Sequence, residues 1–367
     1  MKIITTIARI LVGLLFIFSG LIKANDPLGF SYKLKEYFEV FGLHFLVPAA
    51  LFLAIFICVF EVALGFMLLI GARVKLTLWL SLLMIVFFTF LTFYSAYFNV
   101  VKECGCFGDF LHLTPWTSFY KDLALLILLI ILFIGKQYIN PLVGPRFENV
   151  LIILIIAASI AFPVYTYSYL PVKDFRPYKV GTDIYKATHP EVKYFYKLKN
   201  KKSGETKEFD KWPENWDQEW DYVDSRTENL DPNFKEIIGF AMNNKYGENY
   251  ADEFLQKTGY KFILVAYDLD KTNRDVQGRV NDFAAMCAMD SIEFAGLTSS
   301  DSLKTYNFAK ENNNTFTYYL NGDDVPLKTM IRSNPGLMLL KDATVIEMWH
   351  HNSFPSFNDV KEKYFKK

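Results

Sequence analysis

Residues 47–71 read VPAALFLAIFICVFEVALGFMLLIG, and Glu61 is the one charged residue within this stretch. About 20 apolar residues in a helix are enough to cross a hydrocarbon layer of about 30 Å. A surface helix of a soluble domain would instead carry polar residues at every third or fourth position. The stretch lacks that pattern, and it therefore predicts a membrane-spanning helix.

Four further stretches of the same kind lie on either side of it, at approximately residues 3–22, 76–98, 118–139 and 149–170. Charge is unevenly distributed: residues 1–170 hold 19 of the 78 Asp, Glu, Lys and Arg residues, and residues 171–367 hold the other 59. The second half has 31 acidic and 28 basic residues, so it offers no basic patch to a nucleic acid. We therefore expect five helices in a lipid bilayer, then a water-soluble part, and no nucleic-acid partner.

The orientation follows from the positive charges. Lys2 precedes the first stretch, but the length of that stretch and the spans that follow favour a retained helix over a signal peptide. The short loop between the second and third stretches holds Arg73 and Lys75, and such loops favour the cytoplasmic side. We expect an integral protein of the bacterial inner (cytoplasmic) membrane, with a cytoplasmic N-terminus and a periplasmic, extracytoplasmic C-terminal domain.

A short loop before the fourth stretch carries the candidate chemistry. It reads Cys104-Gly105-Cys106-Phe107-Gly108-Asp109 and holds two of the four cysteines. Two thiols at this spacing can pair only through a small, strained ring, and Gly105 has the backbone freedom that such a ring needs. Strain makes a disulfide easy to reduce, as suits a redox pair, and the outer face of the membrane favours disulfides. Asp109 can orient a partner or handle a proton.

Two other interpretations of this loop stay open: a structural disulfide and a metal-binding loop. The two cysteines and the nearby His112 are too few ligands for a tetrahedral zinc site, so we predict no metal. Cys58 and Cys287 are isolated in apolar or helical surroundings. We expect both of them to be small buried hydrophobic residues.

Charged residues inside a bilayer are costly and often functional. Glu61 lies deepest, and its protonated form can relay protons or donate a hydrogen bond to a quinone carbonyl. The alternative is an interhelical hydrogen bond, with Ser19 or Arg9 as the partner. We expect Lys23 to extend to the membrane surface and Asp122 to be stabilised by the N-terminus of its helix.

A family resemblance lies in four motifs: Arg9-Ile-Leu-Val-Gly-Leu-Leu-Phe-Ile-Phe-Ser-Gly-Leu-Ile-Lys23, Glu61-Val-Ala-Leu-Gly65, Cys104-Gly-Cys-Phe-Gly108 and Lys121-Asp122. Residues 1–140 resemble the DoxX-like membrane proteins, and more narrowly the MauE (methylamine-utilisation protein E) branch. The resemblance rests most on the cysteine loop, because apolar membrane helices are similar to one another in many proteins.

This resemblance implies a four-helix DoxX/MauE-like core in residues 1–140 and a fifth transmembrane helix in residues 141–170. It implies that the protein assists disulfide formation or redox maturation of extracytoplasmic proteins, through Cys104 and Cys106. DoxX relatives are associated with thiosulfate or sulfur oxidation that feeds quinone. The expected partner is an extracytoplasmic thiol or disulfide protein or a small sulfur compound, and quinone is the candidate cofactor. Nothing in the residues themselves points to methylamine.

Residues 171–232 are predicted to connect the two halves through a small β element. A strand is expected at 193–199, a turn at Ser203-Gly204 and a returning strand at 207–209. Three tryptophans follow at intervals of four residues and are expected to pack a short helix or a lid: Trp212, Trp216 and Trp220.

Residues 233–367 alternate between helical and strand patterns. Helices are expected at 233–245, 248–258, 276–289, 300–312 and 357–365. Strands are expected at 261–268, 291–297 and 315–320, followed by a hairpin of 337–340 with 345–349. This order predicts an α/β domain with a mixed central sheet and helices on both faces.

The order of these elements and the segment Met330–Met338, which contains Pro335, resemble a thioredoxin-like fold. In that family the proline is usually cis and lies beside the active dithiol. The family's Cys-x-x-Cys belongs just after the first core strand, where this chain has Lys271–Asp275 and no cysteine. Cys287 lies at the far end of the next helix. The domain is therefore expected to be redox-inert and to dock a partner.

Three functions are consistent with these observations. The leading hypothesis is a membrane thiol–disulfide redox protein, which is either an oxidoreductase itself or an accessory to one. The second is a non-enzymatic, membrane-anchored assembly factor that binds through an inert thioredoxin-like domain. A solute transporter is the third and weakest, since Glu61 is the one intramembrane coupling charge and no inverted repeat is visible.

Overall fold

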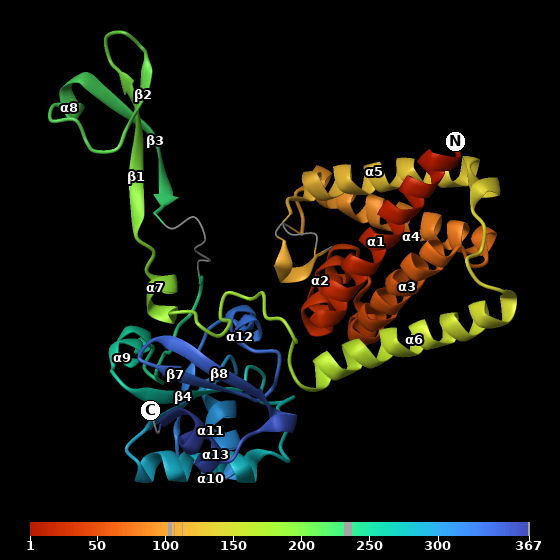
Figure 1. Ribbon diagram of the computed structural model, residues 1–367. Helices are drawn as coiled ribbons and strands as arrows, with labels where there is room; N and C mark the ends of the chain where they lie inside the picture. Colours follow the sequence, from red (N-terminus) through yellow and green to blue (C-terminus); the bar gives the residue numbers. More distant parts are fainter. Residues whose placement is uncertain (102–104, 106, 112, 231–236, 366–367) are drawn as a thin grey trace. The chain divides into compact units, whose positions relative to one another are not determined.

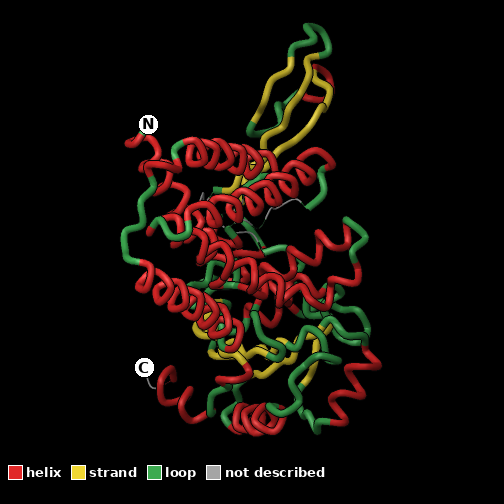
Figure 2. The backbone as a smooth tube through the Cα atoms, turned by 90° about the vertical axis from the view of Figure 1, so that its right-hand side faces the viewer, coloured by secondary structure: helices red, strands yellow, loops and turns green. Residues whose placement is uncertain are grey.

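The computed structural model describes residues 1–101, 105, 107–111, 113–230 and 237–365. The chain divides into two compact units, Met1–Arg176 with Trp349–Phe354, and Pro177–Met348 with Pro355–Lys367 (Figure 1). Long helices make up the first unit, whereas the strands, yellow in Figure 2, belong mainly to the second.

Among the described residues, five helices are long and apolar enough to cross a membrane, as the sequence predicts. They are α1 (Lys2–Asn25), α3 (Ala50–Ile70, with the 3-10 turn η1 His44–Ala49 before it), α4 (Val74–Phe98), α5 (Pro115–Ile134) and α6 (Pro145–Ser168). Length and the near absence of charge are sufficient to identify such helices.

A further helix, α2 (Pro27–Val40), was not predicted. It begins with a capping interaction in which the backbone N–H of Gly29 donates to the Asp26 carboxylate at 2.8 Å, and Pro27 occupies the first turn. One face of the helix is buried through Phe30, Leu34 and Tyr37. The segment is too short and too polar to span a membrane, which is why a search for apolar stretches misses it.

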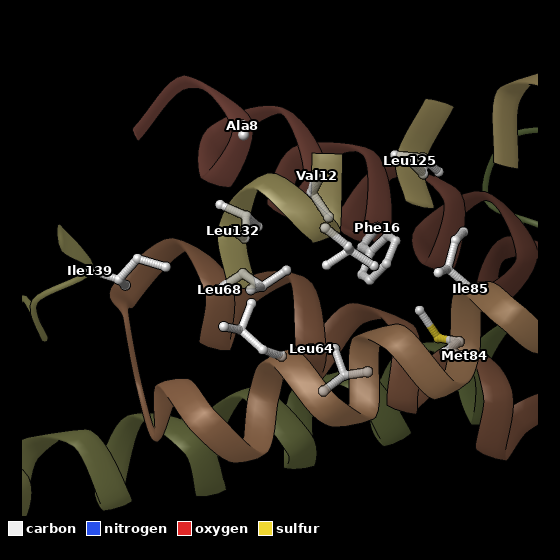
Figure 3. Close-up of a cluster of buried hydrophobic side chains, with 12 residues drawn as sticks. Ala8, Val12, Phe16, Leu64, Leu68, Met84, Ile85, Leu125, Leu132 and Ile139 are labelled. Carbon is white, nitrogen blue, oxygen red and sulfur yellow. The ribbon is translucent and has the colours of Figure 1, made fainter. Parts of the chain in front are cut away.

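Close contact between α1 and α3 organises the helical unit. A Cβ placed on Gly65 would lie 2.7 Å from the carbonyl oxygen of Gly13, so the two backbones approach each other as only glycine permits. Figure 3 shows side chains of four helices that point toward one another beside this contact. They are Ala8, Val12 and Phe16 of α1, Leu64 and Leu68 of α3, Met84 and Ile85 of α4, and Leu125 and Leu132 of α5.

The second unit contains a small antiparallel sheet of order β2-β1-β3 in the described part of the chain. Its strands are β1 (Val192–Asn200), β2 (Thr206–Phe209) and β3 (Trp220–Asn229). The hairpin of β1 and β2 was predicted, with Gly204 at its turn (φ +72°), but β3 was not. A short helix, α8 (Trp216–Glu219), precedes β3, and the rings of Trp212 and Trp216 lie 4.5 Å apart. Trp212 also contacts Tyr196 of β1 at 4.5 Å, and Trp220 contacts Phe209 of β2 at 4.9 Å, so these tryptophans pack against the small sheet.

The other sheet of this unit has the order β6-β5-β4-β7-β8 among the described residues. Its strands are β4 (Tyr260–Val265), β5 (Glu293–Thr298), β6 (Thr317–Leu320), β7 (Gly336–Lys341) and β8 (Thr344–His350). The accompanying helices are α7 (Ile184–Thr188), α9 (Ala251–Gln256), α10 (Gln277–Met289), α11 (Ser302–Glu311), α12 (Asp324–Met330) and α13 (Phe357–Val360), and η5 (Lys361–Phe365) follows α13. β4 runs parallel to β5 and antiparallel to β7, so the predicted mixed sheet is confirmed.

The prediction of a helix at 233–245 is wrong for the described residues 237–245, which form no helix. Gly239 has a φ of +77°, and the backbone of Asn243 bridges to Leu320 at the end of β6. The side chain of Asn321 donates to the Gly239 carbonyl at 3.0 Å and holds the segment in this extended course. Tertiary hydrogen bonds therefore override the local helical pattern here.

Candidate functional site

The chain directly after the predicted redox pair is anchored on α1. Cys104 and Cys106 themselves lie outside the described residues. Phe107 is buried, and its ring centroid lies 5.9 Å from that of Phe18. Asp109 follows in a short 3-10 turn, η2 (Gly108–Phe110).

The deepest predicted site residue, Glu61, forms a buried ion pair. Its Oε2 lies 2.6 Å from Nζ of Lys23, which also donates to the Ser19 hydroxyl at 2.8 Å. The side chains of Lys23 and Glu61 are 2% and 6% exposed. The expectation that Lys23 extends to the surface is therefore wrong, because the carboxylate facing it across the α1–α3 contact holds its ammonium inside. Arg9 lies at a distance, beside Gly71.

A second buried carboxylate, Asp122, has close partners of its own. Its Oδ1 lies 2.9 Å from Nζ of Lys121, and the Thr92 hydroxyl of α4 donates to its Oδ2 at 3.1 Å. Asp122 is the eighth residue of α5, and the field of a helix end fades beyond the first turn. Direct contacts, and not the helix N-terminus as expected, therefore stabilise this carboxylate. Nζ of Lys121 also lies 5.0 Å from the ring centroid of Phe107.

Both ion pairs line one cavity, which we call the bundle pocket. It encloses about 390 Å³ of space between the side chains, part of which is open to the outside. Its remaining wall is apolar or aromatic except for Ser19. The lining residues come from α1, α3, α4, α5 and the cysteine loop: Leu15, Phe16, Ser19, Lys23, Glu61, Met84, Ile85, Phe88, Phe107, Lys121, Asp122 and Leu125.

A second cavity, which we call the loop pocket, adjoins the residues that follow Phe107. Gly108 and Asp109 line it, together with Ile22, Asn25, Asp26, Pro171, Lys173, Asp174, Phe175 and Arg176. It is smaller, at about 250 Å³, and six of its ten lining residues are polar or charged. The described residues Phe107, Gly108 and Asp109 of the cysteine loop thus line two pockets.

The segment after α6 is fixed at the loop pocket by specific contacts. The Asn25 amide donates to the carbonyl of Lys173 at 2.7 Å and accepts from its backbone N–H at 3.1 Å. The Arg176 guanidinium, itself buried, donates to the Asp174 carboxylate at 2.6 and 2.8 Å. A ring contact of 5.0 Å joins Phe175 to Phe110 of η2. These contacts extend the helical unit past its last long helix.

The remaining cysteines are both buried, as expected. Burial, and to a lesser degree the charge of Asp290, raise the pKa of the Cys287 thiol to about 12, so it stays protonated and unreactive at neutral pH. Cys58 packs against other buried residues of α1, α2 and α3. Within the described part of the chain, no group of three or more His, Cys, Asp or Glu residues has the arrangement of a metal site.

The loop after β4 contacts the proline segment. The backbone N–H of Asn273 donates to the Asn334 carbonyl at 3.0 Å, and the Asn334 amide donates to the carbonyl of Asp268 at 2.7 Å. The Asn334–Pro335 peptide bond is cis. The structure thus brings the loop Lys271–Asp275 next to this proline.

The sequence missed the partners of the two buried carboxylates. Lys23, Lys121 and Thr92 were not predicted as site residues, although a carboxylate within a membrane span requires a compensating group. Lys23 is the basic residue closest to the end of the first span, and Lys121 is adjacent to Asp122. A search for cations near predicted spans would have indicated both.

Comparison with known families agrees with the helical unit. Residues 1–135 match the family model described as methylamine utilisation protein MauE. The match runs from α1 to the end of α5 and confirms the MauE resemblance for this part of the chain. No curated protein matches the chain. The family match and the apolar helices together make this an integral membrane protein that contacts the lipid bilayer.

Proposed function

From the MauE match of residues 1–135, we propose that the chain is a membrane thiol–disulfide redox protein. Cys104 and Cys106 exchange electrons between an extracytoplasmic partner and a lipid-soluble carrier. The partner is a thiol or disulfide protein or a small sulfur compound. The family description also supports a role in methylamine utilisation, as the maturation of an extracytoplasmic protein of that process.

One observation carries this proposal: the residues after the cysteine pair border two pockets. Phe107 lines the bundle pocket, whereas Gly108 and Asp109 line the loop pocket. A protein that passes electrons between a water-soluble partner and a lipid-soluble carrier needs access to both from one place. The polar loop pocket suits the partner, with Asp109 beside it, and the apolar helices around the bundle pocket suit the carrier.

The orientation is part of the proposal. The cysteine loop belongs on the extracytoplasmic face of the bacterial inner membrane, where disulfides form and persist. The N-terminus is then cytoplasmic, and the unit beyond Arg176 extracytoplasmic. The buried Cys287, with its raised pKa, takes no part in the exchange.

Thiol trapping tests the proposal. In intact cells, a membrane-impermeant maleimide should label Cys104 and Cys106 after mild reduction and lose access to them after oxidation. A Cys106→Ser variant should accumulate a mixed disulfide with its partner, because Cys104 then lacks the resolving thiol. Cys58→Ser and Cys287→Ser are matched controls and should leave labelling unchanged. Labelling only after cell lysis, or cysteines that stay reduced in oxidant, would contradict the proposal.

A second candidate function follows from the other unit. The mixed order β6-β5-β4-β7-β8 and the contact of Asn273 with Asn334 support a thioredoxin-like fold without a dithiol. Such a unit would bind a partner for a non-enzymatic, membrane-anchored assembly factor. A chain with both Cys104→Ser and Cys106→Ser discriminates the two functions. If the protein is an assembly factor, the double variant should still bind its partner and support the same cell phenotype as the natural chain. If it is a redox protein, cells with the double variant should lose that phenotype.

A further inference from the structure

The bundle pocket is narrow and carries charges, although it lies among apolar helices. About 20 Å³ of it is far enough from the surrounding atoms to take the centre of a water molecule. In this measure, about 10–15 Å³ is enough for one water, so the pocket has room for about one or two. We infer that the pocket is a proton site, in which internal water connects the buried Glu61 with Lys121. Through this water, Glu61 exchanges a proton with the solution on the side of the cysteine loop.

The lining of the pocket offers the hydrogen-bond partners that hold a water in place. Lys23, Glu61, Lys121 and Asp122 contribute charged groups, and Ser19 adds a hydroxyl. Cavities that stay empty are apolar, whereas a water inside a protein makes about three hydrogen bonds to polar groups. Five polar side chains around so small a space are enough for the water that fits there.

Glu61 has a carboxylate oxygen that such a water can satisfy. Its Oε2 is buried and lies 2.6 Å from Nζ of Lys23, but among the described residues no donor has the geometry of a hydrogen bond to this atom. An ionised carboxylate can accept about four hydrogen bonds, and buried polar atoms are rarely left without one. Cys58, about one turn earlier on α3, is a further titratable side chain near this carboxylate. Water in the pocket supplies the O–H donor that Oε2 needs.

Lys121 is the place where this network reaches the surface. Its side chain is 23% exposed, whereas those of Lys23, Glu61 and Asp122 are 6% exposed or less. Nζ of Lys121 lies 5.0 Å from the ring centroid of Phe107, which lines the pocket beside the cysteine loop. Water and hydroxyl groups pass protons along, because each of them both donates and accepts hydrogen bonds. The pocket therefore gives Glu61 a path to the loop side that a dry, apolar bundle would not.

Lys23 can stay buried when Glu61 takes up a proton. Its Nζ donates to the Ser19 hydroxyl at 2.8 Å and lies 5.6 Å and 5.4 Å from the ring centroids of Phe30 and Phe88. Cation–π contacts of this kind stabilise an ammonium that is removed from water. Protonation of the carboxylate therefore does not leave the lysine without favourable contacts.

The use of this proton rests on the proposed function. Joining the thiols of Cys104 and Cys106 forms one S–S bond, passes two electrons to the lipid-soluble carrier and frees two protons. A carboxylate with a water path to the loop can accept one of these protons, and reduction of the disulfide takes it back. Neither the water nor its path to Glu61 involves the cysteines, so the proton site can be tested apart from the redox function.

X-ray footprinting of the full-length chain in lipid nanodiscs tests for the water. Short X-ray pulses split water into hydroxyl radicals, which oxidise the side chains next to that water. Met84 lines the pocket and is 6% exposed, whereas Met67 of α3, at 8%, is not among the described residues that line it. Met84 should form methionine sulfoxide about fivefold faster than Met67, or more. Ile85→Phe, which places a larger side chain at the pocket, should remove this difference; if that variant does not fold, the two methionines of the natural chain decide.

Infrared spectroscopy after a pH jump tests the proton exchange. When the pH falls from about 8 to about 4, Glu61 should gain the band of a protonated carboxyl group within the time of mixing. Lys23→Met/Glu61→Gln has neither buried charge and should lack this band. Glu148→Gln is the matched control, because Glu148 faces Arg73 and is not among the described residues that line the pocket, and it should keep the band.

The outcomes separate this inference from the proposed function. Both measurements should give the same results in the Cys104→Ser/Cys106→Ser chain. Equal oxidation of Met84 and Met67, or a Glu61 band that is absent or appears only as the chain unfolds, would overturn the inference. If the cysteines of such a chain still trap a partner, the redox function stands. Loss of trapping with both signals retained would refute the redox function and leave the proton site.

Discussion

The Lys23–Glu61 pair supports a quantitative prediction about stability. At 2.6 Å, two unit charges attract each other by about 6 kcal/mol for an effective dielectric constant of about 20. Removing one partner leaves the other charge buried and uncompensated, which typically costs about 3–5 kcal/mol. Lys23→Met and Glu61→Gln should each lower the free energy of unfolding by about that amount.

The double variant should be far more stable than the sum of the two losses implies. With both charges replaced by neutral groups of similar size, neither desolvation nor attraction remains, and such replacements are often close to neutral. We expect a coupling free energy of about 3 kcal/mol or more between the two positions. The assay is reversible unfolding of the full-length chain in mixed micelles with a rising mole fraction of SDS, followed by circular dichroism.

The surface pair Lys33–Glu36 provides the control. Its atoms are 3.1 Å apart, but its side chains are 29% and 46% exposed. Exposed pairs contribute about 0–1 kcal/mol, so the same double-mutant cycle on Lys33 and Glu36 should show little coupling. Additive losses at Lys23 and Glu61, or a Glu61→Gln chain as stable as the natural one, would refute the reasoning that the pair is buried and mutually dependent.

Three further predictions concern stability. Gly65→Ala should destabilise the helical unit by about 1–3 kcal/mol, because the added Cβ would lie 2.7 Å from a carbonyl oxygen of α1. Gly144 has open space around it, so Gly144→Ala is the control and should leave stability unchanged. Thermal unfolding of the two variants in detergent measures the difference. Lys261, which is buried, donates to three carbonyls at and just after the end of α9, so Lys261→Met should cost about 3 kcal/mol, measured as faster hydrogen exchange in α9 and β4. Burial lowers the pKa of His350 from 6.5 to about 4, so the folded chain binds fewer protons than the unfolded chain between these values. The contribution of the neutral imidazole to the free energy of unfolding is therefore fully present above about pH 6.5, and about 2 kcal/mol of it is lost by pH 5. Hydrogen exchange in β8 should become faster over this pH range in the natural chain, and His350→Gln should remove that pH dependence.

Patterns confined to one segment were predicted well. The spans of α1 and α3 follow from apolar length, and β4 follows from a run of strand-forming residues. Elements whose structure depends on tertiary contacts with other segments were missed or assigned wrongly. α2 is buried on one face only, and residues 237–245 have a helical pattern that hydrogen bonds from Asn321 and Leu320 override.

The same distinction, between features of one segment and features that need tertiary contacts, applies to the candidate site. The cysteine loop and Glu61 stand out in the sequence, since closely spaced thiols and a carboxylate within an apolar run are chemically conspicuous. The partner of Glu61 does not, because Lys23 is 38 positions away and becomes its neighbour only where α1 packs on α3.

The amino-acid sequence by itself determined that this chain enters a membrane, and at which segments, because transfer of apolar side chains into lipid is a property of each segment alone. It also determined where the thiols lie along the chain. Only the tertiary structure decided that two lysine–carboxylate pairs, from α1, α3 and α5, border one pocket beside the residue that follows Cys106. The reason is that a buried charge is tolerated only next to its opposite. Lys121 and Asp122 are neighbours in the sequence, but Lys23 meets Glu61, and the two pairs meet at one pocket, only through helix packing.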